Sequence, residues 1–139
     1  MTSFEELEHT ADRAFRVTGR DLADLLENAA CAMQALDGVG ASVVGPSAEP
    51  SATREIEVQG IDRESLLVNW LNEILFLEQT QQLVCERFHI HELNDDHLRA
   101  RVETRDCNES HTHIKAATFH NLEIRQTSEG LEVEIVLDV

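Results

Sequence analysis

Residues 66–77 constrain the fold more than any other part of this sequence. They read LLVNWLNEILFL, and apolar side chains recur there at helical spacing over an unusually wide stripe: Leu66, Leu67, Trp70, Leu71, Ile74, Leu75 and Leu77. A stripe of this width needs cover from more than one side. We therefore expect a helix, capped by Asp62, that is sandwiched between layers or lies flat across a sheet.

A second helix is predicted earlier in the chain. Asp21 is a suitable N-cap residue, and Asp24 follows three residues later in a box-like position. Apolar residues then recur at helical spacing up to Leu36, and Gly38 is suited to end the helix. Residues 39–52 carry two glycines and two prolines and are predicted to form a loop.

Strands account for most of the remaining sequence. Polar and apolar residues alternate in 13–19, 54–60, 83–93 and 98–102, and a C-terminal hairpin is expected to join 122–127 to 131–139 through a turn at 128–130. Two helices with about six strands in mostly antiparallel order predict an α+β fold, with the helices packed on a largely antiparallel sheet. A length of 139 residues indicates a single domain, 1–139.

The charge balance excludes several classes of function. There are 27 Asp and Glu residues against 11 Lys and Arg residues, a formal net charge of -16. A phosphate backbone is repelled by such a charge, so we expect no direct DNA binding, whereas a cation or a basic partner protein is attracted. The sequence also lacks a phosphate-binding glycine loop, a nucleophile elbow and a zinc-protease helix, so it does not indicate an autonomous enzyme.

The expected cellular compartment is inferred from the lack of a signal segment and of a membrane-spanning run, and from the cysteine spacing. The N-terminus has no apolar signal segment, and no apolar run approaches the ~20 residues that span a bilayer, so we expect a cytoplasmic protein without membrane contact. Cys31, Cys85 and Cys107 are an odd number without C-x-x-C spacing. Cys31 lies among apolar helix positions and is predicted to be a buried, reduced thiol.

Two acidic positions are candidate cation ligands. Asp12 ends the turn His9-Thr10-Ala11-Asp12, where its carboxylate suits either a hard cation or a turn-capping role. Asp138 and Val139 follow the apolar end of the last strand and would offer a side-chain and an α-carboxylate together. Such oxygen donors suit Ca²⁺ or Mg²⁺, and the alternative is a polar strand end without a ligand.

Basic and imidazole side chains give weaker signals. His89 and His91, and likewise His111 and His113, have the spacing of zinc ligands on a strand. Phe88 and Ile90, however, should occupy the inner face of their strand, which leaves the first histidine pair on the solvent side. Lys115 lies in the run IKAA and is interpreted as an exposed strand residue, or as a group that binds an anion or neutralises a carboxylate.

Taken together, these segments resemble one known family. The motifs are L-x-H-T-A-D ending at Asp12, LxxLLENAAxAM at 22–33, LLVNWLNEILFL at 66–77, IKAATFH at 114–120, and a last strand ending in Asp138-Val139. They span nearly the whole chain in the same order as in archease, the accessory protein of the RtcB-type tRNA-splicing RNA ligase. The resemblance implies an elaborated strand-helix-strand-strand fold.

The resemblance also implies a function and a site. An archease is not a ligase; it promotes guanylylation and multiple turnover of the ligase and can broaden its nucleotide use, and it meets tRNA only through that partner. Its functional centre is a divalent-cation site, expected to hold Ca²⁺, with Mg²⁺ or Mn²⁺ as alternatives. The ligands map onto Asp12, Asp138 and Val139, and the lysine of the same functional surface maps onto Lys115.

This sequence departs from the family pattern in places. Asn69 and Phe119 stand where relatives often have Asp and Tyr, and residues 104–113 form a shorter segment than the usual acidic loop. If that loop contacts the ligase in relatives, the shorter segment of this chain gives a different docking geometry. Two other functions remain as alternatives: a metal-dependent phosphoester hydrolase that uses Asp12, Asp138 and a histidine pair, and a chaperone-like binding module without a metal.

Overall fold

A computed structural model describes residues 4–8, 13–36, 52–81, 83–106 and 114–138 of the chain. In chain order the elements are β1 (Phe4–Glu8), β2 (Arg13–Gly19), α1 (Leu22–Leu36), β3 (Ala52–Gln59), α3 (Arg63–Gln81), β4 (Leu83–Leu93), β5 (His97–Asp106), β6 (Ala116–Thr118), β7 (Arg125–Thr127) and β8 (Gly130–Asp138). The predicted α+β fold, with antiparallel strands, is confirmed. Within the described residues, neither helix is long and apolar enough to cross a bilayer.

The strands divide between two sheets, whereas the sequence pattern suggested one. One sheet has the order β1-β2-β8-β6, and β7 also pairs with β8; the other has the order β3-β5-β4. Every pairing is antiparallel. Alternation along a strand shows which side chains are buried but not which strand is the neighbour, so the sequence did not reveal this division.

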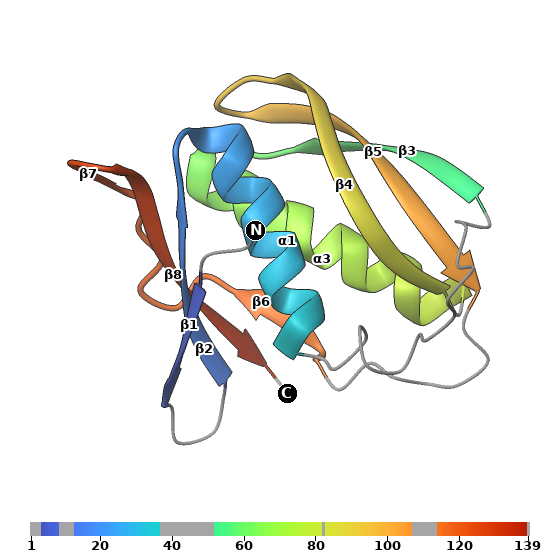
Figure 1. Cartoon of the computed structure of the whole chain (residues 1–139), viewed down its shortest axis with the longest axis horizontal. Coiled ribbons are helices and arrows are strands. Elements are labelled where there is room, and N and C mark those ends of the chain that lie inside the picture. The colour runs from blue at the N-terminus through green and yellow to red at the C-terminus, as the bar shows by residue number, and fades with distance from the viewer. Residues whose placement is uncertain (1–3, 9–12, 37–51, 82, 107–113, 139) are drawn as a thin grey trace.

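Both helices in the described part of the chain lie between the two sheets (Figure 1). Helix α1 contacts β2 on one side and β4 on the other, while α3 contacts β6, β3 and β4. The predicted caps are present: an Asp21 Oδ1 accepts from the Asp24 N–H at 2.9 Å, and Asp62 Oδ1 accepts from the Ser65 N–H at 2.8 Å. The expectation that the helix over residues 66–77, which is α3, is sandwiched between layers is therefore confirmed.

Trp70 shows why α3 needs cover on several sides. Its side chain is fully buried, and its indole N–H donates to the Leu26 carbonyl of α1 at 2.9 Å. Its ring meets Phe88 of β4 edge-on, with the ring centroids 5.9 Å apart. The indole N–H thus has a hydrogen-bond acceptor, and the indole ring has an apolar packing partner. These two contacts join α3 to α1 and to the three-stranded sheet.

The C-terminal hairpin is shorter than predicted. Its first strand, β7, covers only Arg125–Thr127, and Gly130 begins β8 instead of belonging to the turn. Residues 122–124 are not paired as a strand because Ile124 is buried and its N–H donates to a Glu64 carboxylate oxygen at 3.0 Å. Gly130 has a φ of 138°, and a Cβ there would meet the Gly19 carbonyl oxygen at 2.3 Å.

Candidate functional site

The end of β8 brings two of the predicted site residues together. Asp138 pairs with Ala116 of β6, and the Lys115 N–H donates to the Asp138 carbonyl oxygen at 2.7 Å. The side chains of Lys115 and Asp138 are both exposed. A cation and a carboxylate from distant parts of the sequence thus share one strand end on the surface.

Helix α3 holds the segment that carries Lys115. The Asn72 amide binds Ala117 in both directions: it accepts from the Ala117 N–H at 2.7 Å and donates to the Ala117 carbonyl at 3.2 Å. About two helical turns further on, Gln79 donates to the Ile114 carbonyl at 3.1 Å. The chain around Lys115 is therefore bonded to α3 on one side and to β8 on the other, which limits its freedom to move.

The other expected ligands, Asp12 and Val139, lie outside the described residues. Their chain neighbours are described: Arg13, which follows Asp12, pairs with Leu137, which precedes Asp138. Arg13 also donates to the Leu36 carbonyl at 2.7 Å. In the described part of the chain, no three His, Cys, Asp or Glu side chains are grouped so that they could hold a metal ion. The cation site therefore stays a prediction that needs Asp12 and Val139 besides Asp138.

The first histidine pair lies on the solvent side of β4, as predicted. His89 and His91 are exposed, and their rings stack with centroids 6.5 Å apart. His91 Nε2 is hydrogen-bonded to Glu55 Oε2 of β3 at 2.8 Å, and Arg101 of β5 lies 3.5 Å from the same carboxylate. The His91 hydrogen bond is the main cause that lowers the pKa of Glu55. His111 and His113 lie outside the described residues.

A second charged cluster on this sheet was missed at the sequence level. His97 Nε2 is hydrogen-bonded to Glu57 at 2.7 Å, and Arg99 approaches both Glu57 and Glu92 within 3.4 Å. The His97 hydrogen bond, followed by the charge of Arg99, lowers the pKa of Glu57. A signal was present in the sequence: glutamates alternate at Glu55 and Glu57 of one strand, and arginines alternate at Arg99 and Arg101 of another. In the sheet, Glu55 pairs with Arg101 and Glu57 pairs with Arg99.

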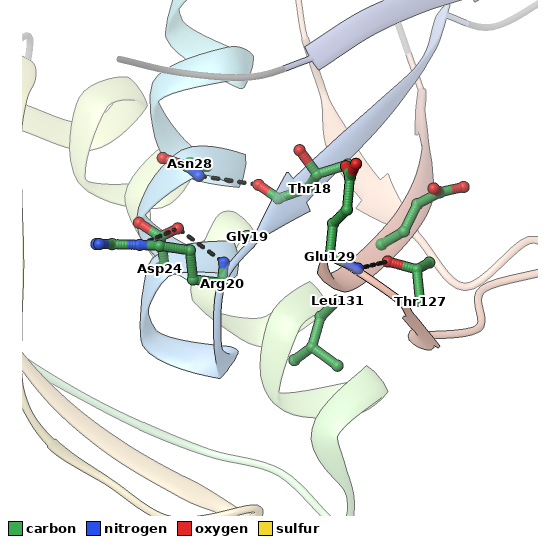
Figure 2. Close-up of a pocket in the computed structure, with 9 residues that line it drawn as sticks. Thr18, Gly19, Arg20, Asp24, Asn28, Thr127, Glu129 and Leu131 are labelled. Atoms are coloured by element: carbon green, nitrogen blue, oxygen red, sulfur yellow. Dashed lines mark hydrogen bonds and ion pairs between the residues drawn. The ribbon is translucent and has the colours of Figure 1, made fainter.

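A cavity of about 410 Å³ lies between the start of α1 and the β7–β8 hairpin. Figure 2 shows that several of its polar groups are bonded to one another: Asp24 accepts from the backbone and side chain of Arg20, and Asn28 donates to the Thr18 carbonyl. Gly19 pairs with Leu131 at this end, six residues along β2 from the Arg13–Leu137 pair. At about 3.3 Å per residue, the cavity is roughly 20 Å from Asp138 and is separate from the candidate site.

The described cysteines, Cys31 and Cys85, are reduced and not part of a disulfide. Cys31 is half-buried, so it is less enclosed than predicted, because α1 leaves this position at the margin of the core. Cys85 is buried, and its burial, together with the charge of Glu78, raises the pKa of its thiol. A thiol in this state is a poor nucleophile, so Cys85 has a packing role.

The fold and this site define a class: a small two-sheet α+β protein whose candidate functional groups lie on an exposed strand end. Comparison with known proteins identifies the family. Residues 4–139 match the model of the archease protein family (MTH1598/TM1083). This chain belongs to the archease family.

Individual relatives cover nearly the full chain. The chain is 33% identical to protein archease of Methanosarcina acetivorans, over 98% of this chain and 95% of the relative, and 33% identical to that of Methanothermobacter thermautotrophicus, over 100% of both. The solution structure of Methanobacterium thermoautotrophicum protein 1598 matches with a TM-score of 0.77 at 32% identity, over 100% of both chains. An archease from Thermotoga maritima, described as a possible chaperone, matches with a TM-score of 0.65 at 22% identity, over 97% of this chain and 96% of that chain, and supports the fold.

Proposed function

We propose that this protein activates an RtcB-type tRNA-splicing RNA ligase in the cytoplasm, by promoting its guanylylation and multiple turnover, and is not itself a ligase. Membership of the archease family supports this proposal. The observation that carries it is the joining of Lys115 and Asp138 on an exposed strand end. Groups in that position can enter a partner's active site, whereas an autonomous enzyme encloses its reacting groups in a cavity.

A divalent cation fits the chemistry of the residues at this end of the molecule. Asp138 offers exposed carboxylate oxygens, which are the donors that Ca²⁺ prefers, with Mg²⁺ or Mn²⁺ as alternatives. We assign Asp12 and Val139 as the further ligands. When bound, the cation supplies charge neutralisation at a nucleotide α-phosphate.

The residues of this chain have distinct parts in the proposal. Asp12, Asp138 and Val139 hold the cation, and the strand pairing of β8 orients Asp138. We assign the Lys115 ammonium group to the same surface, where it offsets the repulsion between carboxylates and phosphate oxygens as the two proteins approach. Because α3 and β8 both bind the Lys115 segment, the backbone that carries this charge is held in place before the partner arrives.

A chaperone-like module without a metal is the second candidate. The description of the Thermotoga maritima relative as a possible chaperone favours it. In that case the acidic surface as a whole would hold a basic client, and no single carboxylate would matter. Asp12→Asn and Asp138→Asn separate the two candidates, since each changes the net charge of -16 by only one unit.

The test is the formation of the covalent ligase–GMP adduct by the purified ligase of the same organism, with and without this protein. We expect stimulation by the wild type and at least a tenfold loss with Asp138→Asn. Asp95→Asn is the matched control, because Asp95 is an exposed aspartate in the turn between β4 and β5 and the charge change is identical. Full stimulation by Asp138→Asn would contradict the cation assignment, and no stimulation by the wild type would contradict the function.

A further inference from the structure

Two of the five described aromatic side chains are exposed, although most apolar residues of this size are buried. Phe15, Trp70 and Phe88 are at most 9% exposed, whereas Phe76 and Phe119 are each 57% exposed. A single exposed apolar residue is ordinary on a protein surface. Two aromatic residues along one line need an explanation, because they leave a large apolar area in water.

Phe76 and Phe119 lie along the seam where α3 meets β6. Asn72 binds Ala117 and Gln79 binds Ile114, so the helix and the strand run in opposite directions side by side. Phe76 falls between Asn72 and Gln79 on the same helical stripe, level with Lys115. Phe119 follows Ala117 by two residues in the other direction. At about 1.5 Å per helical residue and 3.3 Å per strand residue, the two aromatic positions are roughly 13 Å apart along the seam.

Both aromatic residues belong to backbone segments that are held by hydrogen bonds. The turn after β6 is closed by the Leu122 N–H, which donates to the Phe119 carbonyl at 3.1 Å, and Asn121 adopts a left-handed φ of 52° there. The Ile124 N–H, bound to Glu64 of α3, ties down the far end of this turn. Phe76 is held by its helix. An aromatic side chain on rigid backbone loses little entropy on binding, which suits an interface anchor.

We infer that Phe76 and Phe119, with Lys115 level with Phe76 along the seam, anchor a docking surface for a protein partner with a basic surface. Half-buried Glu73 of α3 and exposed Asp138 at the end of β8 provide an acidic rim. Exposed Glu123, in the turn after β6, lies 3.4 Å from Arg125 and is partly neutralised. A second copy of this chain would be repelled, because each copy carries a formal charge of -16, and so would a nucleic acid. A basic protein surface is attracted by the rim and covers the aromatic rings.

The identification of this partner as the RNA ligase rests on the proposed function. The seam carries Lys115, which we assign to activation, so the same contact that buries the two rings brings Lys115 and Asp138 to the ligase. Binding through this docking surface would thus present the exposed site, with Lys115 and Asp138, to the ligase in a fixed orientation.

The experiment measures the affinity of the purified ligase for Phe76→Gln, Phe119→Gln and the double variant by isothermal titration calorimetry. We expect Kd to rise about tenfold for each single variant and about a hundredfold for the double variant, with unchanged melting temperatures because both side chains are exposed. Wild-type affinity should also fall as salt is raised from 50 to 300 mM, a range chosen to shorten the screening length. Ile61→Gln is the matched control, since Ile61 is 90% exposed but precedes α3 instead of facing β6, and we expect its Kd to be unchanged.

Each other outcome overturns a defined part of the inference. A double variant that binds as tightly as the wild type removes the docking surface while leaving the proposed function intact. An equal loss with Ile61→Gln contradicts the location. A wild-type dimer in sedimentation analysis that Phe119→Gln dissolves would assign the surface to a second copy. Wild-type protein that neither binds nor stimulates the ligase contradicts the proposed function and this partner together.

Discussion

Lys115 is the only lysine in the sequence, and the structure holds it by its backbone while its side chain is exposed. The bonds that position it come from the main chain of Lys115 and its neighbours, so the ammonium group contributes little to the fold. The residue can therefore be changed without unfolding the protein, which makes its function directly testable.

We predict that Lys115→Ala keeps the wild-type melting temperature within about 2 °C but stimulates ligase guanylylation at least tenfold less. Lys115→Arg should retain part of the stimulation, because it keeps the charge with a different shape. Arg20→Ala is the control, since Arg20 is an exposed cation beside the cavity at the other end of β2. Wild-type stimulation by Lys115→Ala would show that Lys115 is an ordinary surface residue.

At the scale of elements, the contact between α3 and β6 is the link on which the candidate site depends. Asn72 satisfies both polar backbone groups of Ala117, and Ala117 itself is buried. Loss of the side chain would leave a buried N–H and carbonyl without their partner, which costs more than the loss of an exposed hydrogen bond.

We predict that Asn72→Ala lowers the free energy of unfolding by about 1–3 kcal/mol, measured by urea denaturation. Asn69→Ala is the matched control, because Asn69 makes a single exposed bond to the Gln59 carbonyl, and we expect a loss of about 0.5–1 kcal/mol. Asn72→Ala should also reduce ligase stimulation by freeing the Lys115 segment. Equal stability losses in the two variants would contradict the special role of Asn72.

The outer face of the three-stranded sheet predicts a dependence on pH. The pKa of Glu55 is lowered from its ordinary value of 4.5, so Glu55 stabilises the folded state above that value, and the contribution is lost as pH falls through the lower folded-state pKa. His91→Ala removes the main cause. We expect the Glu55 pKa to rise towards 4.5 in a carboxyl NMR titration, while the Glu57 pKa, lowered by His97, stays where it is.

An unchanged Glu55 titration in His91→Ala would mean that Arg101 alone holds the carboxylate in its charged form. The effect on overall stability should be small, because these side chains are exposed and their ion pairs are screened by solvent.

At the scale of the whole molecule, the net charge of -16 determines which partners can approach. We predict that the isolated protein does not bind bare tRNA at physiological salt in a fluorescence anisotropy titration, and that tRNA joins only when the ligase is present. An unrelated basic RNA-binding protein serves as the positive control for the titration. Sub-micromolar binding of tRNA by this protein alone would contradict the prediction.

The sequence predicted the elements better than their arrangement. The caps at Asp21 and Asp62, the inward faces of the strands and the wide stripe of α3 all follow from local spacing, and all are confirmed. The short strand β6 was not resolved from the apolar run around Lys115, because three residues are too few to show alternation. The first strand of the hairpin was overextended, because Ile124 alternates like a strand residue but is bonded to Glu64.

The sequence by itself determined the helices, most of the strands, the acidic surface and, through its motifs, the archease family, because propensity, periodicity and charge are written in neighbouring residues. Only the tertiary structure decided that the strands form two sheets, that β6 lies between β8 and α3, and that the main chain of Lys115 is bonded to that of Asp138. The same is true of the line formed by Phe76 and Phe119. These features depend on contacts between residues far apart in the chain, whose choice of partner no local pattern records.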